Sequence, residues 1–232
     1  MNNISIIPIT NLPEFEPKHD LVDEIIKTFS SNNFVLEDKD VIVITQKIVS
    51  KVEDRLIKND HENIEKLIQQ ESLEILRKRG DTVIARTKHG FICANAGIDK
   101  SNIKKGSVLL LPEDPDKTSR DIQKKIEYNT NKKVSIIISD TFGRAWRKGQ
   151  TNVAIGSSGI EPLESYIGEK DAFDNELFAT EIAIIDELAG AAELVMKKSD
   201  NIPVAIIRGV DYKSSDLGVE ELIRKEDEDF FL

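Results

Sequence analysis

The ten residues that follow one apolar run carry several side chains that bind ions. The run is Val134–Ile138, and the residues after it read SDTFGRAWRK. Asp140 can supply a carboxylate ligand to Mg²⁺ or Mn²⁺, and Thr141 can add a neighbouring hydroxyl oxygen. Arg144 and Arg147 carry guanidinium groups that bind phosphate or carboxylate with two hydrogen bonds. If the strand ends at Asp140, this stretch predicts a metal-phosphate site, although an aspartate that only caps a turn gives the same pattern.

A second apolar segment leads to a similar loop. The stretch CANAGIDKSN, Cys93–Asn102, contains Asp99, and Gly97 allows the backbone to pass close to a ligand. A plain turn is the alternative explanation. Two separate strands that each lead to an aspartate in a glycine-containing loop favour convergence on divalent cations, as in phosphoryl-transfer sites.

Two lysines could supply the positive charge for a phosphate chain. Lys47 and Lys51 are four residues apart, so they share a face if this segment is a helix. The alternative is an ordinary solvent-exposed face. The chain has 232 residues and a formal net charge of −10, which makes it a poor candidate for non-specific nucleic-acid binding. An anionic ligand must therefore meet a local basic cluster, to which Arg208 at the end of the last apolar run could contribute.

The elements that must position these residues are predicted from apolar spacing. Strands are expected at Ile4–Ile9, Asp40–Thr45, Ser107–Pro112, Val134–Ser139, Asn152–Ile160 and Val204–Val210. Helices are expected at His19–Phe29, His61–Arg79 and Leu177–Lys198, and the tail VEELIRKEDEDFF also has a helical pattern. The segments TVIART and FICAN flank Lys88-His89-Gly90 and predict a hairpin. The elements do not alternate strictly as strand and helix, so we expect an α+β fold with mixed or antiparallel sheets and packed helices.

Several classes of site and location are disfavoured. The sequence has neither a GxxxxGK[ST] phosphate loop nor a GxGxxG fingerprint, and its three histidines and one cysteine lack zinc-site spacing. The single cysteine indicates a reducing compartment. No signal peptide or membrane-length apolar run is present, so we expect a cytoplasmic protein without membrane or nucleic-acid partners.

An ordered set of motifs between residue 4 and about residue 210 resembles the coenzyme F-420-0:γ-glutamyl ligase family. The motifs are NLP, QKIVSKVEDR, RTKHGFICANAGIDKSN, LLLPEDPD, ISDTFGRAWRKGQTNVAIG, DELAGAAELVM and IPVAIIRG. The resemblance implies a fold without a P-loop, an intertwined homodimer, and one ligase unit over residues 1–232 with a small subdomain or arm around 160–176. It implies GTP-dependent addition of L-glutamate to coenzyme F-420-0 through an acyl phosphate, giving coenzyme F-420 with one or more glutamates.

The same resemblance implies roles for individual residues. It implies two divalent cations, Mg²⁺ or Mn²⁺, held by Asp99, Asp140 and Thr141, and it allows K⁺ as a further ion. The residues expected to contact the nucleotide are Thr10, Asn11, Leu12, Pro13, Gln46, Lys47, Lys51 and Asn102. The residues expected to act in catalysis are Asp99, Asp140 and Arg144.

Two other functions stay open from the sequence. One is a regulatory protein that binds GTP and metal without turnover. The other is the same ligase chemistry on a different carboxylate acceptor.

Overall fold

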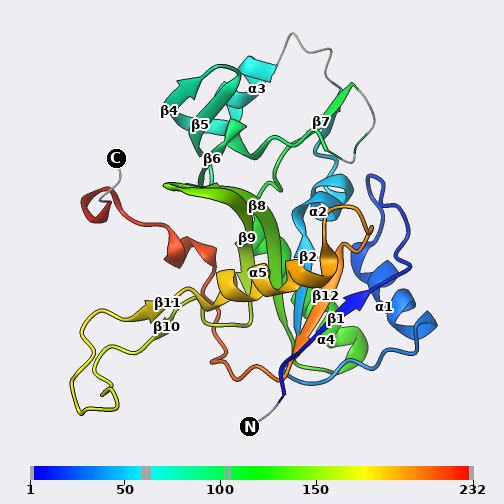
Figure 1. The fold of residues 1–232 in the computed structure, drawn as a ribbon. Coiled ribbons are helices and arrows are strands. Elements are labelled where there is room, and N and C mark those ends of the chain that lie inside the picture. The colour runs from blue at the N-terminus through cyan, green and yellow to red at the C-terminus, as the bar shows by residue number, and fades with distance from the viewer. Residues whose placement is uncertain (1–2, 59–63, 102, 104–105, 230–232) are drawn as a thin grey trace.

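The computed structural model describes residues 3–58, 64–101, 103 and 106–229 (Figure 1). Its first half contains the elements β1 Ser5–Ile9, α1 Leu21–Ser31, β2 Val41–Thr45, α2 Gln46–Val52, β3 Leu56–Lys58, α3 Ile64–Glu71, β4 Ser72–Arg79, β5 Thr82–Thr87, β6 Ile92–Ala94 and β7 Ser107–Leu109. The second half contains α4 Pro115–Thr130, β8 Ser135–Arg144, β9 Arg147–Ser158, β10 Glu164–Ser165, β11 Glu181–Ile182, α5 Ile184–Met196 and β12 Val204–Arg208.

A five-stranded sheet with the order β1-β12-β2-β8-β9 forms the centre of the fold. The β2–β8 pair is parallel and the other neighbours are antiparallel, so the expected α+β class with mixed sheets is confirmed. Helix α5 crosses the front of the sheet in Figure 1 and packs on β9 and β12, while α4 packs on β8 and β9 from behind. Strands β2 and β12 and the first half of β8 are buried because their β-branched runs are covered on both faces.

A smaller sheet, β4-β5-β6, lies beside the central one. Together with α3 it encloses its own cluster of buried residues, which includes Ile68, Val83 and Ala85. The hairpin predicted around Lys88-His89-Gly90 is confirmed, because β5 pairs antiparallel with β6. This sheet carries the loop of Asp99 toward the end of the central sheet.

Two helix predictions are wrong in extent. The segment His61–Arg79 is not one helix: α3 ends at Glu71, and Ser72–Arg79 is the strand β4, paired with β5. Hydrogen bonding to the neighbouring strand outweighs the helical spacing there, and it leaves Leu73 exposed. The first three residues of that prediction lie outside the described part. Likewise, α5 covers only Ile184–Met196 of the expected Leu177–Lys198 helix.

The C-terminal tail also differs from its prediction. It contains the short 3₁₀ segments Val219–Leu222 and Glu226–Glu228 rather than a longer helix, and its last three residues lie outside the described part. Residues 161–183 project from the body of the molecule as an extended arm closed by the β10–β11 pair (Figure 1). The assignment of residues 1–232 to one ligase unit stays a prediction. None of the described helices is long and apolar enough to cross a membrane.

The strand expected to stop at Ser139 instead runs on as β8 to Arg144 and turns into β9. Asp140 therefore lies inside a strand, opposite Val153, and does not begin a loop. The parallel pairing of Thr45 with Ser139 places the start of α2 next to Asp140. This register is what brings the candidate site together.

Candidate active site

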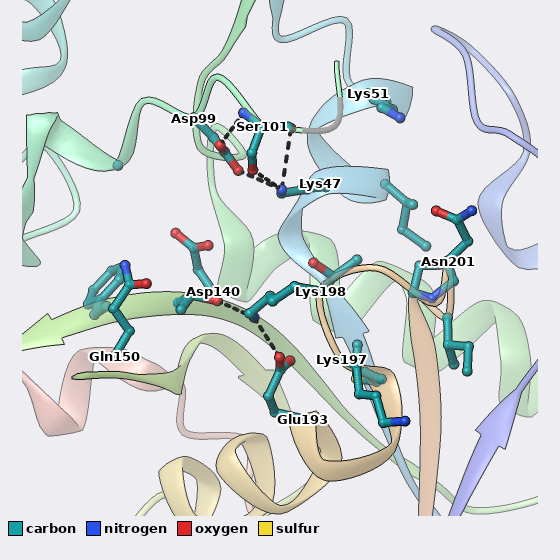
Figure 2. Close-up of a pocket in the computed structure, with 18 of the residues that line it drawn as sticks. Lys47, Lys51, Asp99, Ser101, Asp140, Gln150, Glu193, Lys197, Lys198 and Asn201 are labelled. Carbon is teal, nitrogen blue, oxygen red and sulfur yellow. Dashed lines mark hydrogen bonds and ion pairs between the residues drawn. The ribbon is translucent and has the colours of Figure 1, made fainter.

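A cavity of about 820 Å³ opens where β2 passes into α2, and its walls also come from the loop after β6, from β8 and β9, and from the end of α5 (Figure 2). Its lining includes Asp99, Asp140 and Thr141, the three residues expected to hold cations. It also includes Lys47 and Lys51. Tertiary structure thus joins groups that lie almost a hundred residues apart in the sequence.

Asp99 is held by an ammonium group and a backbone donor. Lys47 Nζ lies 2.9 Å from Asp99 Oδ2 and donates to Ser101 Oγ at 2.6 Å, while the Ser101 N–H donates to Asp99 Oδ1 at 2.7 Å. Burial by itself would raise the pKa of Asp99, but the hydrogen bonds from Lys47 and Ser101 outweigh it and hold that pKa below its ordinary value. Asp99 is therefore a carboxylate at neutral pH.

Asp140 has a different environment. Burial raises its pKa to about 6, opposed by a hydrogen bond from the Thr141 N–H and reinforced by the nearby charge of Asp99. It forms no ion pair with any residue that the structure describes. Cys93 lies close enough that burial and the charge of Asp140 raise the pKa of its thiol to about 12, which makes it inert as a nucleophile.

A hydrogen-bonded ring surrounds Thr141. Its hydroxyl donates to Asn152 Oδ1 at 2.7 Å and accepts from Lys198 Nζ at 2.6 Å. Lys198 Nζ also lies 2.8 Å from Glu193 Oε1, and Asn152 Nδ2 donates to Glu193 Oε2 at 2.9 Å. These three partners were not predicted from the sequence. The only local signal in the sequence is that Glu193 lies in the last turn of α5 and Lys198 follows the helix. Charged residues at the end of a helix are common in surface helices.

Some of the residues expected to contact the nucleotide line the cavity, and others lie outside its lining. Lys51 lines the cavity and forms an ion pair with Glu14, while Leu12 and Pro13 form part of the same wall. Thr10 and Asn11 are exposed and outside the lining. The Thr10 carbonyl accepts a hydrogen bond from Asn32 Nδ2 at 2.9 Å, which anchors the segment that leads into the wall.

Gln46, Arg144 and Arg208 do not line this cavity. Gln46 is fully buried and its Oε1 accepts from Ser50 Oγ at 2.8 Å, so it supports the first turn of α2. Arg144 is exposed near the β8–β9 turn and donates to the Lys148 carbonyl. Asn102 lies outside the described residues.

Arg208 is at the opposite end of the sheet from the cavity. Its guanidinium donates to both carboxylate oxygens of Asp40, at 2.7 and 2.6 Å. Asp40 is fully buried, so this pair is structural and Arg208 does not join the basic cluster.

The donor set fits hard divalent cations. Asp99, Asp140 and Thr141 offer only oxygen. Burial, reinforced by the nearby charge of Asp99, raises the pKa of Asp140, and a cation bound there would favour the ionised carboxylate. The part of the chain that the structure describes contains no cluster of three or more His, Cys, Asp or Glu side chains suited to a metal. Magnesium is commonly bound by one or two carboxylates, with phosphate oxygens and water as the other ligands, so two aspartates and a hydroxyl are sufficient.

Comparison with known proteins gives consistent matches. A family model described as F420-0:Gamma-glutamyl ligase matches residues 10–209. A protein of Methanocaldococcus jannaschii named coenzyme F420:L-glutamate ligase is 43% identical over 216 residues, which is 85% of this chain and 86% of that protein. Proteins of the same name from two strains of Methanococcus maripaludis, C7 and S2, are 43% and 42% identical; the matches cover 86% and 90% of this chain, and 88% and 89% of theirs.

Proposed function

The chain belongs to the F420-0:gamma-glutamyl ligase family, and we propose that it is a coenzyme F420 glutamate ligase that uses GTP to add L-glutamate to coenzyme F-420-0. One observation carries the assignment to this cavity: two carboxylates and a hydroxyl that suit divalent cations lie beside two lysines that suit a phosphate chain. Relatives named coenzyme F420:L-glutamate ligase support a deazaflavin coenzyme as the acceptor and L-glutamate as the amino acid that is added.

The chemistry explains why a nucleotide is needed. A carboxylate does not condense with an amine at neutral pH without activation. A carboxylate oxygen of the acceptor attacks the γ-phosphorus of GTP; an O–P bond forms, the bond to the β-phosphate bridging oxygen breaks, and GDP leaves. The glutamate amine then attacks the acyl carbon; a C–N bond forms, the C–O bond to phosphate breaks, and the amine loses a proton. The product is an amide, GDP and phosphate.

The residues of the cavity have distinct tasks in this scheme. Lys47 and Lys51 bind phosphate oxygens, because an ammonium acts as a compact positive charge. Asp99, Asp140 and Thr141 would hold two divalent cations, Mg²⁺ or Mn²⁺. Bound there, such cations neutralise the negative charge that accumulates when the phosphate chain and the acceptor carboxylate approach each other.

Other properties implied by the family resemblance are part of the proposal. We expect a homodimer without a P-loop, a cytoplasmic location, and K⁺ as a further ion. Thr10, Asn11, Gln46 and Asn102 remain candidate nucleotide contacts, and Arg144 remains a candidate catalytic residue that would have to reach the cavity when the substrates are bound. The turn beside Arg144 contains Trp146 at a positive φ of 62°.

The test is a reaction with coenzyme F-420-0, GTP, L-glutamate and Mg²⁺ or Mn²⁺, followed by mass measurement of the product. Addition of glutamate with release of one GDP per amide supports the proposal, and ATP in place of GTP tests the nucleotide. Binding of GTP without any amide product would instead favour a regulatory protein. An amide formed only with another carboxylic acid would move the activity to a different acceptor.

A further inference from the structure

A pair of opposite charges, Glu193 and Lys198, lies at the α5 side of the cavity. Lys47 and Lys51 are on α2, whereas Glu193 and Lys198 come from the last turn of α5 and the segment after it (Figure 2). In Figure 2 Lys47 and Lys51 are drawn above Lys198 and Glu193, so the two groups come from different walls of the cavity. Both members of the pair line the cavity.

The pair is held in position by a buried amide. Asn152 is only 5% exposed, and it donates through Nδ2 to Glu193 Oε2 while its Oδ1 accepts from Lys198 Nζ at 3.1 Å. Because the amide contacts both charged groups, it keeps the carboxylate and the ammonium side by side. Asn152 is thus a positioning residue for this pair.

We propose that Glu193 and Lys198 form the binding site for the amino-acid substrate, with Glu193 accepting hydrogen bonds from its amino group and Lys198 pairing with one of its carboxylates. This inference rests on the proposed function and assigns a part of the same cavity to L-glutamate. Before the substrate binds, the two side chains satisfy each other at 2.8 Å.

The charges of this site favour an amino acid over a phosphate chain. The Glu193 carboxylate repels a phosphate group but complements an ammonium, and Lys198 complements a carboxylate. A molecule that carries both an amine and carboxylates matches the pair, whereas a nucleotide matches only half of it. Gln150 also lines the cavity, and Figure 2 draws it on the other side of Asp140 from this pair.

The position of the pair also suits the second step of the reaction. Lys198 Nζ donates to Thr141 Oγ1 at 2.6 Å, so an amino acid held by this pair lies next to the residues assigned to phosphoryl transfer. Its amine would then be close to the activated acyl group, and proximity of this kind is a large part of catalysis by ligases.

Two variants and one control test this assignment. Lys198→Met removes the cation, and Glu193→Gln removes the anion while keeping an oxygen that can accept from Asn152. Lys27→Met is the matched control: Lys27 and Lys198 are 61% and 60% exposed and pair with carboxylates at 2.7 and 2.8 Å, but Lys27 lies on α1 outside the cavity. Thermal unfolding of each variant checks that it is folded.

Two reactions separate glutamate binding from phosphoryl transfer. The first is ligation, from which KM for L-glutamate and KM for GTP are obtained. The second replaces glutamate with hydroxylamine, which attacks the acyl phosphate through nitrogen, releases phosphate, and gives a hydroxamate. Hydroxylamine has no carboxylate and therefore needs no contact with Lys198.

The expected result is a KM for L-glutamate raised by about 10-fold or more in both variants, since each loses a charge-assisted hydrogen bond. In Glu193→Gln, KM for GTP and the rate of hydroxamate formation should stay within about 2-fold of the wild type, a change too small to represent a lost hydrogen bond. Lys198→Met also loses the hydrogen bond to Thr141, so it should raise KM for L-glutamate by a larger factor than it lowers the rate of hydroxamate formation. The Lys27→Met control should match the wild type in KM for L-glutamate, in KM for GTP and in the rate of hydroxamate formation.

Other outcomes overturn the assignment. Equal losses in ligation and hydroxamate formation would place Lys198 and Glu193 in phosphoryl transfer. Unchanged KM for L-glutamate in both variants would place the amino acid elsewhere. A wild-type protein that forms hydroxamate from coenzyme F-420-0 but no glutamate amide would show that the activation step is right and the amino acid wrong, whereas a wild type that forms neither would contradict the proposed function itself.

Discussion

Lys47 Nζ lies 2.9 Å from Asp99 Oδ2, and this ion pair ties the first turn of α2 to the loop that follows β6. The contact brings a residue of the central sheet region against a residue carried by the smaller sheet. Because the two side chains face the cavity that also contains Asp140, movement of either element would change the geometry of the whole site.

Asp140→Asn and Asp99→Asn should each lower the ligation rate by at least about 100-fold, as expected when charge stabilisation of a transition state is lost. The fold should survive, because asparagine has nearly the same size and Asp140 is already difficult to ionise where it lies. The measurements are the rate of amide formation at saturating Mn²⁺ and circular dichroism. A folded variant with near-wild-type activity would remove that residue from the site.

Lys51→Ala should raise KM for GTP more than KM for L-glutamate. Lys51 is among the less exposed lysines, and its ammonium faces Glu14 at the wall assigned to the nucleotide. Steady-state kinetics with each substrate varied in turn gives both constants. Lys133→Met, a change in an exposed lysine paired with Glu127 outside the cavity, serves as the control. Equal effects on the two substrates would exclude Lys51 from a nucleotide-specific role.

Arg208→Met should destabilise the protein by about 3–5 kcal/mol, because it leaves the buried Asp40 carboxylate without its cation. Denaturant unfolding monitored by circular dichroism measures the loss. The same change at the exposed Lys133 should cost less than about 1 kcal/mol, as is usual for surface ion pairs. If Arg208→Met unfolds at the wild-type midpoint, the Asp40 pair does not stabilise the sheet.

Asp186→Asn should change the pH dependence of stability. Burial raises the pKa of Asp186 above its ordinary value of 3.8, although its Oδ1 accepts from the Ala154 N–H at 2.8 Å. The unfolded chain therefore loses this proton at lower pH than the folded chain, and the ionised carboxylate costs stability as pH rises through the folded-state pKa. An asparagine oxygen keeps the hydrogen bond without that cost.

The Asp186 variant should accordingly be more stable than the wild type at neutral pH, with the difference shrinking as pH falls toward 3.8. Melting temperatures of both proteins across this range test the sign. A difference that grows on acidification, or a variant less stable at neutral pH, contradicts the proposed cost of burying the charge.

The chain should form a homodimer that is required for activity. The arm of residues 161–183 exposes two large aromatic side chains, Phe173 and Phe178, at 86% and 77%, and a second subunit would cover them. Light scattering should give about twice the chain mass of 26.1 kDa. Phe173→Ser with Phe178→Ser should shift the mass toward one chain, and a monomer with full ligase activity would refute the requirement.

Elements whose patterns are local could be predicted from the order of the residues alone. The β-branched runs around β2, β8 and β12 predicted buried strands, and Lys88-His89-Gly90 predicted the β5–β6 turn, because side-chain alternation and turn chemistry act between near neighbours. The ordered motifs likewise indicated the ligase family, which the matches to known proteins confirm.

Features that depend on pairing between distant segments could not be predicted in this way. Ser72–Arg79 became a strand because β5 offered its hydrogen-bonding edge, although the apolar spacing there favoured a helix. Asp140 lines the cavity from a position inside β8, because this strand continues past Asp140 into a hairpin with β9. Lys198 contacts Thr141 and Glu193 contacts Asn152 because α5 packs across β9, a contact that no spacing within the sequence specifies. Residues brought together by helix-on-sheet packing leave no local pattern, which is why that part of the site was visible only in the folded chain.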